Sequence, residues 1–391
     1  MEEYLIFNPL NDDFIQTTGS TWSHLMEHQG GFIAYDGVLM PIDLKALVLW
    51  ECSSTEHHLL LDSPSSPSLD LSSDYNTSGY PKNVREDTWS VILAHPVEGT
   101  CSTVMVETDP TLYPFMDELL FVNKPAKMLT LPGIGKEKEK CLASEVNAWL
   151  YGSKEGSKVM SFATKSLQTI PSTKKKKFQG NKKLPTKNNN ALTNRYLVRP
   201  CHRLDFDTSG VIIMGLTPES HRKTSFLFEQ RHVSKTYIAL VAGHVSKDSG
   251  IISYPIGKVH CTRGDYNEFA CYTGCNGPAL SDFINGSIRE AETEFFVANR
   301  FSIPVFALQQ SNVTAKYTRI ILKPKTGRGH QLRLHLAAIG HPILGDRLHS
   351  QSSHIQRCTP RLCLHAEELQ VTALMGNMTS SIIKIQSIAP F

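Results

Sequence analysis

The chain has 391 residues, of which 40% are hydrophobic and 20% are charged, and its formal net charge is +3. This composition is typical of folded, globular proteins and excludes a disordered chain, a collagen and a coiled coil. No apolar run approaches the roughly 18 residues that a membrane-spanning helix needs, so we expect no membrane partner.

The small net charge hides an uneven distribution. Residues 1–100 contain 15 acidic and 3 basic residues, which leaves 22 acidic and 37 basic residues in the remainder. A basic body of this kind favours a polyanionic partner, most often nucleic acid. Solubility alone explains the charge equally well, so this observation does not decide between the two.

Residues 1–115 form an acidic N-terminal region without a recognisable motif. Pro, Ser and Asp cluster at 62–80 and predict a loop, whereas the short apolar runs at 44–50 and 89–94 predict strands. The first residues carry acids and none of the basic residues that targeting peptides need, which favours the cytoplasm or the nucleus and leaves organelle import open.

The cysteines give no sign of a disulfide framework, because there are nine of them spread along the chain. Such usage suits a reducing compartment. The close pairs Cys271/Cys275 and Cys358/Cys363 lack the Cys-x-x-Cys spacing of zinc sites, so we expect no structural metal.

The pattern of strands and helices becomes clearer from residue 119. A strand is predicted at 119–122 and a helix at 141–151, followed by a lysine-rich insertion at 152–190 with ten lysines and one acid. We expect this insertion to be disordered. Its four consecutive lysines at 174–177 suit RNA affinity or nuclear import, and a merely solvated loop is the alternative.

The rest of the chain predicts one mixed domain. Helices are expected at 217–230 and 331–339, and strands at 211–216, 235–243, 294–297, 318–322, 368–372 and 381–385. Regular βαβ alternation is absent, so we predict an α+β catalytic domain over residues 116–391.

A polar segment, HRLDFDTSG at 202–210, runs directly into the apolar strand predicted at 211–216. It brings a cation, a carboxylate and hydroxyls together where functional loops commonly lie, which makes Asp205 a candidate catalytic group. Asp205 and Asp207 together could instead form a metal loop. The third reading is a turn whose side chains bond their own backbone.

A second segment, TGRGHQLRLH at 326–335, opens a predicted helix with two arginines and two histidines. The N-terminus of a helix binds phosphate oxygens readily. Arg333 lies about one turn inside the helix, from where its guanidinium could fork onto a carboxylate. The alternative is a surface helix with solvated cations.

Together these segments resemble the RluA-type RNA pseudouridine synthases. HRLDFDTSG fits the family signature HRLDxxTSG, Lys235-Thr236-Tyr237 is similar to its tyrosine-bearing motif, and residues 326–346 are similar to a third motif, with Gly329 where the family usually has Thr. Shorter matches are Asn123-Lys124-Pro125 and PIGK at 255–258. The resemblance spans about 118–375 and is interrupted by the insertion.

The resemblance implies a pseudouridine synthase fold: a mixed, largely antiparallel central sheet with flanking helices and a basic RNA-binding cleft. It also implies an isomerase that flips out a uridine of ribosomal or transfer RNA and works as a monomer without a cofactor. Asp205 would be the catalytic carboxylate, and Arg333 would pair with it directly. The further residues implied are Arg203, Tyr237 and Leu332 at the substrate and Lys235, Arg328 and His330 at the RNA.

Two rival functions remain at this stage. A phosphatase of the DxDxT type would use Asp205, Asp207 and Mg²⁺, but that class has an apolar strand before its first aspartate, and here Cys201-His202-Arg203 precedes it. A non-catalytic RNA-binding protein on the same fold is the second rival. The set of Asp205, Tyr237 and Arg333 argues against lost catalysis.

Overall fold

The computed structural model describes residues 3–8, 13–18, 32–35, 38–42, 46–51, 90–94, 97–98, 118–133, 140–166, 197–260, 268–274, 278–304, 314–375, 378–387 and 389–391. The predicted loop at 62–80, the lysine run at 174–177 and Cys275 lie outside these residues. No helix within the described parts is long and apolar enough to cross a membrane.

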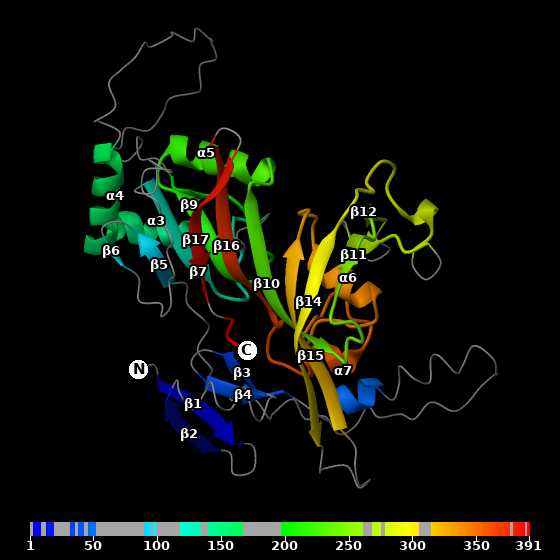
Figure 1. The fold of residues 1–391 in the computed structure, drawn as a ribbon. Helices are drawn as coiled ribbons and strands as arrows, with labels where there is room; N and C mark the ends of the chain where they lie inside the picture. Colours follow the sequence, from blue (N-terminus) through cyan, green and yellow to red (C-terminus); the bar gives the residue numbers. More distant parts are fainter. Residues whose placement is uncertain are drawn as a thin grey trace, which may run out of the picture.

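An eleven-stranded sheet organises the described part of the chain (Figure 1). Its main path runs in the order β11 (Ser249–Ile252), β14 (Thr293–Pro304), β15 (Thr314–Pro324), β10 (Val233–Ala242), β16 (Leu364–Met375), β9 (Ser209–Gly215), β7 (Leu119–Lys124), β5 (Ser90–Ala94) and β6 (Val97–Glu98). Two further strands pair beside this path, β17 (Met378–Gln386) with β16 and β8 (Arg199–Pro200) with β9. Within this sheet only β16 and β9 pair in parallel, which confirms a mixed, mostly antiparallel α+β architecture.

Two smaller sheets accompany the large one. β1 (Glu3–Asn8), β2 (Asp13–Thr18), β3 (Phe32–Tyr35) and β4 (Val38–Pro41) form a four-stranded sheet, and β12 (Ile256–Val259) pairs with β13 (Glu268–Cys271) as a ribbon. The labelled helices are α3 (Leu142–Gly152), α4 (Lys154–Ser166), α5 (Pro218–Glu229), α6 (Gln331–Ala338) and α7 (Ser353–Arg357), with a 3₁₀ turn at Leu280–Asp282. Residues 46–51 are also helical.

The core is divided between the two halves of the sheet. α3 and α4 cover one face of β7 and β9, and apolar residues of β7, β9, β10 and β16 form a separate cluster on the other face. A larger cluster joins β10 and β15 to α6. Tyr237 packs partly against both the α3 side and the α6 side, so it lies at the seam where the two halves meet.

Most of the predicted elements are confirmed. β5, β7, β9, β10 and β14 to β17 occupy the predicted strand positions, and α3, α5 and α6 occupy the predicted helices. Helix α5 begins as expected, since the Thr217 hydroxyl accepts a hydrogen bond from the backbone of Ser220 at 3.1 Å and Pro218 follows it.

The strand predicted at 44–50 is wrong, because residues 46–51 are helical. Ala46, Leu47 and Val48 are buried in the cluster around β10 and β15, and Glu51 forms an ion pair with Lys316 of β15 at 2.8 Å. A short apolar run does not distinguish a buried helical turn from a buried strand. This part of the acidic N-terminal region therefore packs on the sheet, and β5, from the same region, is one of the strands of that sheet. The boundary near residue 115 stays a prediction.

The prediction that the lysine-rich insertion is disordered is wrong for its first part, because residues 154–166 form α4. Val159 and Ala163 are fully buried against the same cluster as α3. Gly156 permits this packing: a Cβ there would lie 2.5 Å from the Cα of Leu150. The lysine-rich composition led to the prediction of disorder, although small apolar residues of this segment share one face of a helix.

Candidate active site

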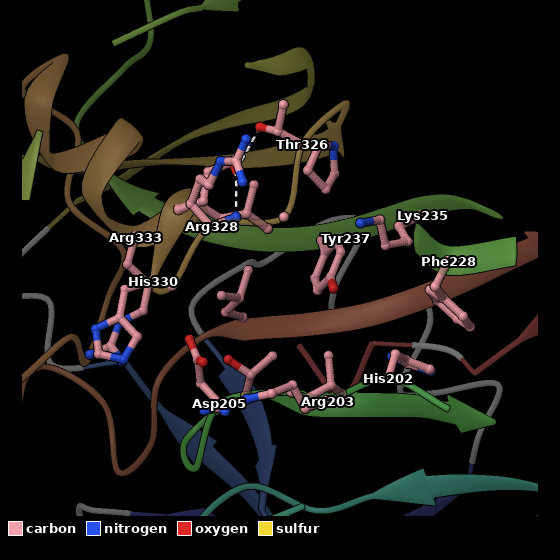
Figure 2. A pocket seen from close by; sticks show the side chains of 18 of the residues that line it. His202, Arg203, Asp205, Phe228, Lys235, Tyr237, Thr326, Arg328, His330 and Arg333 are labelled. Atoms are coloured by element: carbon pink, nitrogen blue, oxygen red, sulfur yellow. Dashed lines mark hydrogen bonds between the residues drawn. The ribbon is translucent and has the colours of Figure 1, made fainter. Parts of the chain in front are cut away.

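A cavity of about 570 Å³ opens between the loop before β9, strand β10 and the N-terminus of α6 (Figure 2). All eight residues singled out from the sequence line it: Arg203, Asp205, Lys235, Tyr237, Arg328, His330, Leu332 and Arg333. They come from three segments that are far apart in the chain, so the fold brings together what the sequence only suggested.

Asp205 lies in the loop between β8 and β9, and neighbouring backbone groups of this loop are clamped. The Thr130 hydroxyl donates to the carbonyl of Leu204 at 2.8 Å and accepts from the Leu204 N–H at 3.1 Å. Thr130 and Leu204 are both buried. These two bonds fix the backbone of the residue immediately before Asp205.

Lys124 holds the other side of the same loop. Its fully buried ammonium donates to the carbonyls of Pro125 and Met128 at 2.8 Å and to that of Phe206 at 3.3 Å. Burial, assisted by the charge of Arg361, lowers the pKa of Lys124 to about 7, while the carboxylate of Asp205 opposes this shift. Asp205 therefore lies between two clamped residues, with the buried amino group of Lys124 nearby.

The base of the loop rests on a buried polar network. The Ser209 hydroxyl bonds His365 Nδ1 at 2.7 Å and also accepts a hydrogen bond from Arg361. Gly210 follows with φ +123°, and a Cβ there would lie 2.2 Å from the carbonyl oxygen of Ala366. Only glycine permits this close approach of β9 to β16.

Tyr237 faces the cavity from β10 opposite Asp205 (Figure 2). The pairing of β10 with β16 shifts register between Thr236 and Tyr237, and such irregularities re-aim a side chain near functional sites. Burial, together with the carboxylate of Asp205, raises the pKa of Tyr237. The phenol is therefore protonated at neutral pH, and it lines the same cavity as the carboxylate that acts on it.

The predicted contact between Arg333 and Asp205 is wrong. Arg333 Nε and Nη2 instead donate to the two carboxylate oxygens of Asp346 at 2.9 and 2.5 Å, and both residues are almost completely buried. No ion pair joins Asp205 to Arg333 among the described residues. Asp346 is the last residue of the same motif, and its carboxylate accepts both hydrogen bonds of the guanidinium.

Asp205 nevertheless acts on Arg333 electrostatically. Burial alone would lower the pKa of Arg333, but the hydrogen bond and charge of Asp346, with a further contribution from Asp205, raise it. For Asp346, burial would raise the pKa of the carboxyl, and its contacts with Arg333 outweigh burial and lower it. Both members of the pair are charged at neutral pH.

Two histidines meet beside this ion pair. His330 Nδ1 and His349 Nε2 are 2.7 Å apart, and the backbone N–H of His349 donates to Asp346 at 3.0 Å. Burial lowers the pKa of His330, and it lowers that of His349 to about 4, so the pair is neutral near pH 7. His330 adopts a left-handed conformation, φ +56°, at the start of α6.

The opening of the cavity carries the remaining cations. Arg203 is exposed, Lys235 is half-buried, and Arg328 Nε donates to the carbonyl of Glu290 at 2.9 Å. Leu332 is buried and contributes an apolar wall. An anionic ligand with an apolar or aromatic ring matches this combination of groups.

Sequence reasoning missed the residues that hold the site together. Thr130 and Lys124 lie in the predicted start of the domain, and Asp346 and His349 lie at or just beyond the end of the third motif. Asp346 carried a signal as an acid in a motif rich in basic residues, and Lys124 lay in the short match Asn123-Lys124-Pro125, but neither was assigned a role. Among the described residues, no group of three or more His, Cys, Asp or Glu side chains is placed to hold a metal ion.

Comparison with known proteins supplies a family for this chain. The family model described as "RNA pseudouridylate synthase" matches residues 118–338, more than half of the chain. The "Dual-specificity RNA pseudouridine synthase RluA" of Haemophilus influenzae is 37% identical over 173 residues, which cover 44% of this chain and 66% of that protein. The enzyme of the same name from Escherichia coli K12 is 37% identical over 172 residues, covering 44% and 65%.

Among solved structures, one titled "Human RNA Pseudouridylate Synthase Domain Containing 1" shares 28% sequence identity and has a TM-score of 0.37. The match covers 48% of this chain and 68% of that one. The similarity to the two bacterial relatives spans just under two thirds of their length.

Proposed function

Because this chain belongs to the RNA pseudouridylate synthase family, we propose that it is an isomerase that converts specific uridines of structured ribosomal or transfer RNA into pseudouridine. The reaction breaks the N1–C1′ glycosidic bond, turns the uracil ring and rejoins it through C5. It involves no net oxidation or reduction, and we propose that this chain performs it without a cofactor.

Asp205 is the catalytic carboxylate in this proposal. A carboxylate can serve the reaction by attacking C6 of the base, by attacking C1′ of the ribose, or by removing a ribose proton. Each route requires a carboxylate held at a fixed position against the nucleoside. The clamps from Thr130 and Lys124 on the two residues beside Asp205 supply that rigidity.

Tyr237 and Leu332 bind the uracil, and the Arg333–Asp346 pair acts as the rigid wall behind them. The phenol provides a flat face for the base and a hydroxyl near the carboxylate. Because Arg333 is engaged by Asp346, we assign it a positioning and electrostatic role rather than direct pairing with Asp205. The charge of Asp205 and that of Arg333 still influence one another.

The RNA approaches along the cationic opening. A stacked uridine cannot reach Asp205, so the enzyme must flip it out at a cost of a few kcal/mol. Arg203, Arg328 and Lys235 form a basic cleft that holds the phosphate backbone, and Arg203 occupies the space that the flipped base leaves. His330 completes the RNA contact at the start of α6.

The observation that carries the proposal is the convergence of Asp205, Tyr237 and the third motif on one cavity large enough for a nucleoside. We further propose that the protein acts as a monomer in the cytoplasm or the nucleus. Pseudouridine mapping by carbodiimide-block sequencing tests the function, on RNA from cells with and without this gene.

We expect at least one ribosomal or transfer RNA uridine to lose its modification without the gene, and the purified chain to restore it in vitro. An unchanged pseudouridine map, together with RNA binding by the purified chain, would instead favour the non-catalytic RNA-binding protein.

A further inference from the structure

The cavity has two ends. Asp205, His330 and Arg333 lie at one end, and Lys235, Phe228 and His202 lie at the other, with Tyr237 between them (Figure 2). The proposed chemistry uses the first end and the centre. The second end contains Lys235, so far assigned only in general terms to the phosphate backbone, and His202, which has no task in the proposed function.

The hydrogen bonding of His202 determines which of its ring nitrogens carries the proton. The backbone N–H of Ile213 donates to His202 Nε2 at 3.1 Å, so Nε2 is an acceptor and the proton of the neutral ring must be on Nδ1. Burial, with a smaller effect of Lys235, lowers the pKa of His202 to about 3. His202 is therefore neutral and presents a single N–H donor.

The orientation of this donor is also fixed. The ring of Phe228 stacks on His202 with centroids 4.3 Å apart and an interplanar angle of 22°. One side of the imidazole is therefore covered, and its plane is set by α5. The Nδ1–H has no hydrogen-bond partner within the described part of the chain.

Lys235 supplies a cation at the same end. Its side chain is half-buried on β10, and a Cβ at Gly327 would lie 3.7 Å from Nζ, so the ammonium reaches across the cavity to the turn before α6. Burial and the nearby charge of Arg231 lower the pKa of Lys235. Among the described residues, its ammonium has no ion-pair or hydrogen-bond partner.

We propose that Lys235 and His202 form a phosphate subsite, which binds one phosphodiester group of the RNA strand next to the flipped uridine. An ammonium and a fixed N–H donor in one half-buried place require an acceptor with negative charge, and a phosphodiester supplies both. The inference rests on the proposed function, because it needs the uridine to occupy the Asp205 end. Its role is to set the register of the strand, so that only one nucleotide reaches Asp205.

One acidic residue opposes an anion here. Glu229 lines the same end of the cavity and is exposed. Its carboxylate weakens the attraction of Lys235 for phosphate, and solvent screens this effect. Glu229→Gln should therefore tighten RNA binding, by about two- to threefold at low salt, without a change to the cavity walls.

The test is a chemical double-mutant cycle. The probe is a synthetic RNA hairpin that carries the uridine found by pseudouridine mapping, with one phosphodiester at a time replaced by an uncharged methylphosphonate. Binding is measured by fluorescence anisotropy for the native chain and for Lys235→Gln, Lys235→Arg and His202→Gln. Lys223→Gln is the matched control, because Lys223 is a partly exposed lysine of α5 that pairs with Glu219 outside the cavity.

We expect that replacement of one phosphodiester beside the target uridine by a methylphosphonate lowers the RNA affinity of the native chain about tenfold. Lys235→Gln should bind more weakly and lose this linkage effect, and the slope of log K against log salt should fall by about one. Lys235→Arg should restore the linkage effect, and Lys223→Gln should leave it unchanged. His202→Gln should reduce the effect of the same linkage and no other.

Equal linkage effects in the native chain and in Lys235→Gln would overturn the subsite, while continued pseudouridine formation in the same hairpin would show the proposed function intact. Absence of pseudouridine formation by the native chain would overturn the proposed function itself, and the subsite with it.

Discussion

Substitution of Thr130 by Val isolates the role of the loop clamp. Valine nearly keeps the shape of threonine and removes only the hydroxyl. That hydroxyl makes two buried hydrogen bonds to the backbone of Leu204, next to Asp205. The change therefore loosens the loop without a cavity and without any change of charge.

The magnitude follows from these contacts. Each buried backbone group that loses its partner costs about 1–3 kcal/mol, and two such groups are affected. The extra methyl group of valine returns about 0.8 kcal/mol. We expect the free energy of unfolding to fall by about 1–5 kcal/mol. A displacement of Asp205 by about 1 Å would lower kcat by about 100-fold.

Thr318 provides a matched control. Its buried hydroxyl donates to the carbonyl of Gly243 at 2.7 Å and accepts from the Val245 N–H at 3.1 Å, which repeats the geometry of Thr130. Thr318 does not line the cavity. Urea titrations of both Thr→Val variants should give similar losses of stability, and single-turnover assays under native conditions should show a lower kcat for Thr130→Val alone.

The reasoning about the clamp would be refuted by a normal kcat in Thr130→Val at the expected loss of stability. It would be refuted equally if Thr318→Val slowed the reaction to the same extent. Thr130→Ser, which keeps the hydroxyl, should retain most of the activity.

The ionisable groups Lys124, Asp346 and His349 each give a further prediction. Lys124→Met removes the ammonium that joins three carbonyls and should lower kcat at least tenfold in single-turnover assays, with RNA affinity unchanged in titrations. Asp346→Asn leaves the buried charge of Arg333 unpaired and should lower the unfolding free energy by about 3–5 kcal/mol in urea. Because the pKa of His349 is lowered from 6.5 to about 4, the unfolded chain binds more protons in this interval, so stability falls as pH falls from 6.5 to 4 and His349→Gln should flatten that fall.

Each of these three has a clear contrary result. Full activity of Lys124→Met would show that Thr130 alone suffices to hold the loop. A loss below about 1 kcal/mol in Asp346→Asn would place the pair in the range of solvated surface ion pairs. An unchanged pH profile in His349→Gln would assign the acid sensitivity to other histidines.

Local sequence patterns predicted most of the fold, because in those segments the spacing of apolar residues agrees with the residues that begin and end each element. The apolar strand predicted at 235–243, which ends at Gly243, and the Thr217-Pro218 start of α5 are examples. The helix at 46–51 and α4 could not be predicted from the sequence. In both segments a few apolar residues are buried against distant parts of the chain, and neither a short apolar run nor a lysine-rich composition indicates that packing. Such long-range contacts leave no local trace.

The site was predictable in its members and not in its pairings. The motifs contained the predicted residues that line the cavity, but Arg333 forms its ion pair with Asp346 and not with Asp205. A guanidinium pairs best with a carboxylate that accepts two parallel hydrogen bonds from it. The sequence does not show which of the two aspartates has that geometry. The clamps by Thr130 and Lys124 bind backbone groups, which every sequence contains, so the match at Asn123-Lys124-Pro125 did not reveal what Lys124 holds.

The proposed catalysis depends most on the carboxylate of Asp205, and Asp205→Asn tests that role most directly. The amide keeps the size of the side chain and removes its charge and its nucleophilic oxygen. Pseudouridine formation on the mapped RNA should become undetectable, while the dissociation constant for that RNA stays within a few-fold of the native value. Product formed by Asp205→Asn at the native rate would contradict the account.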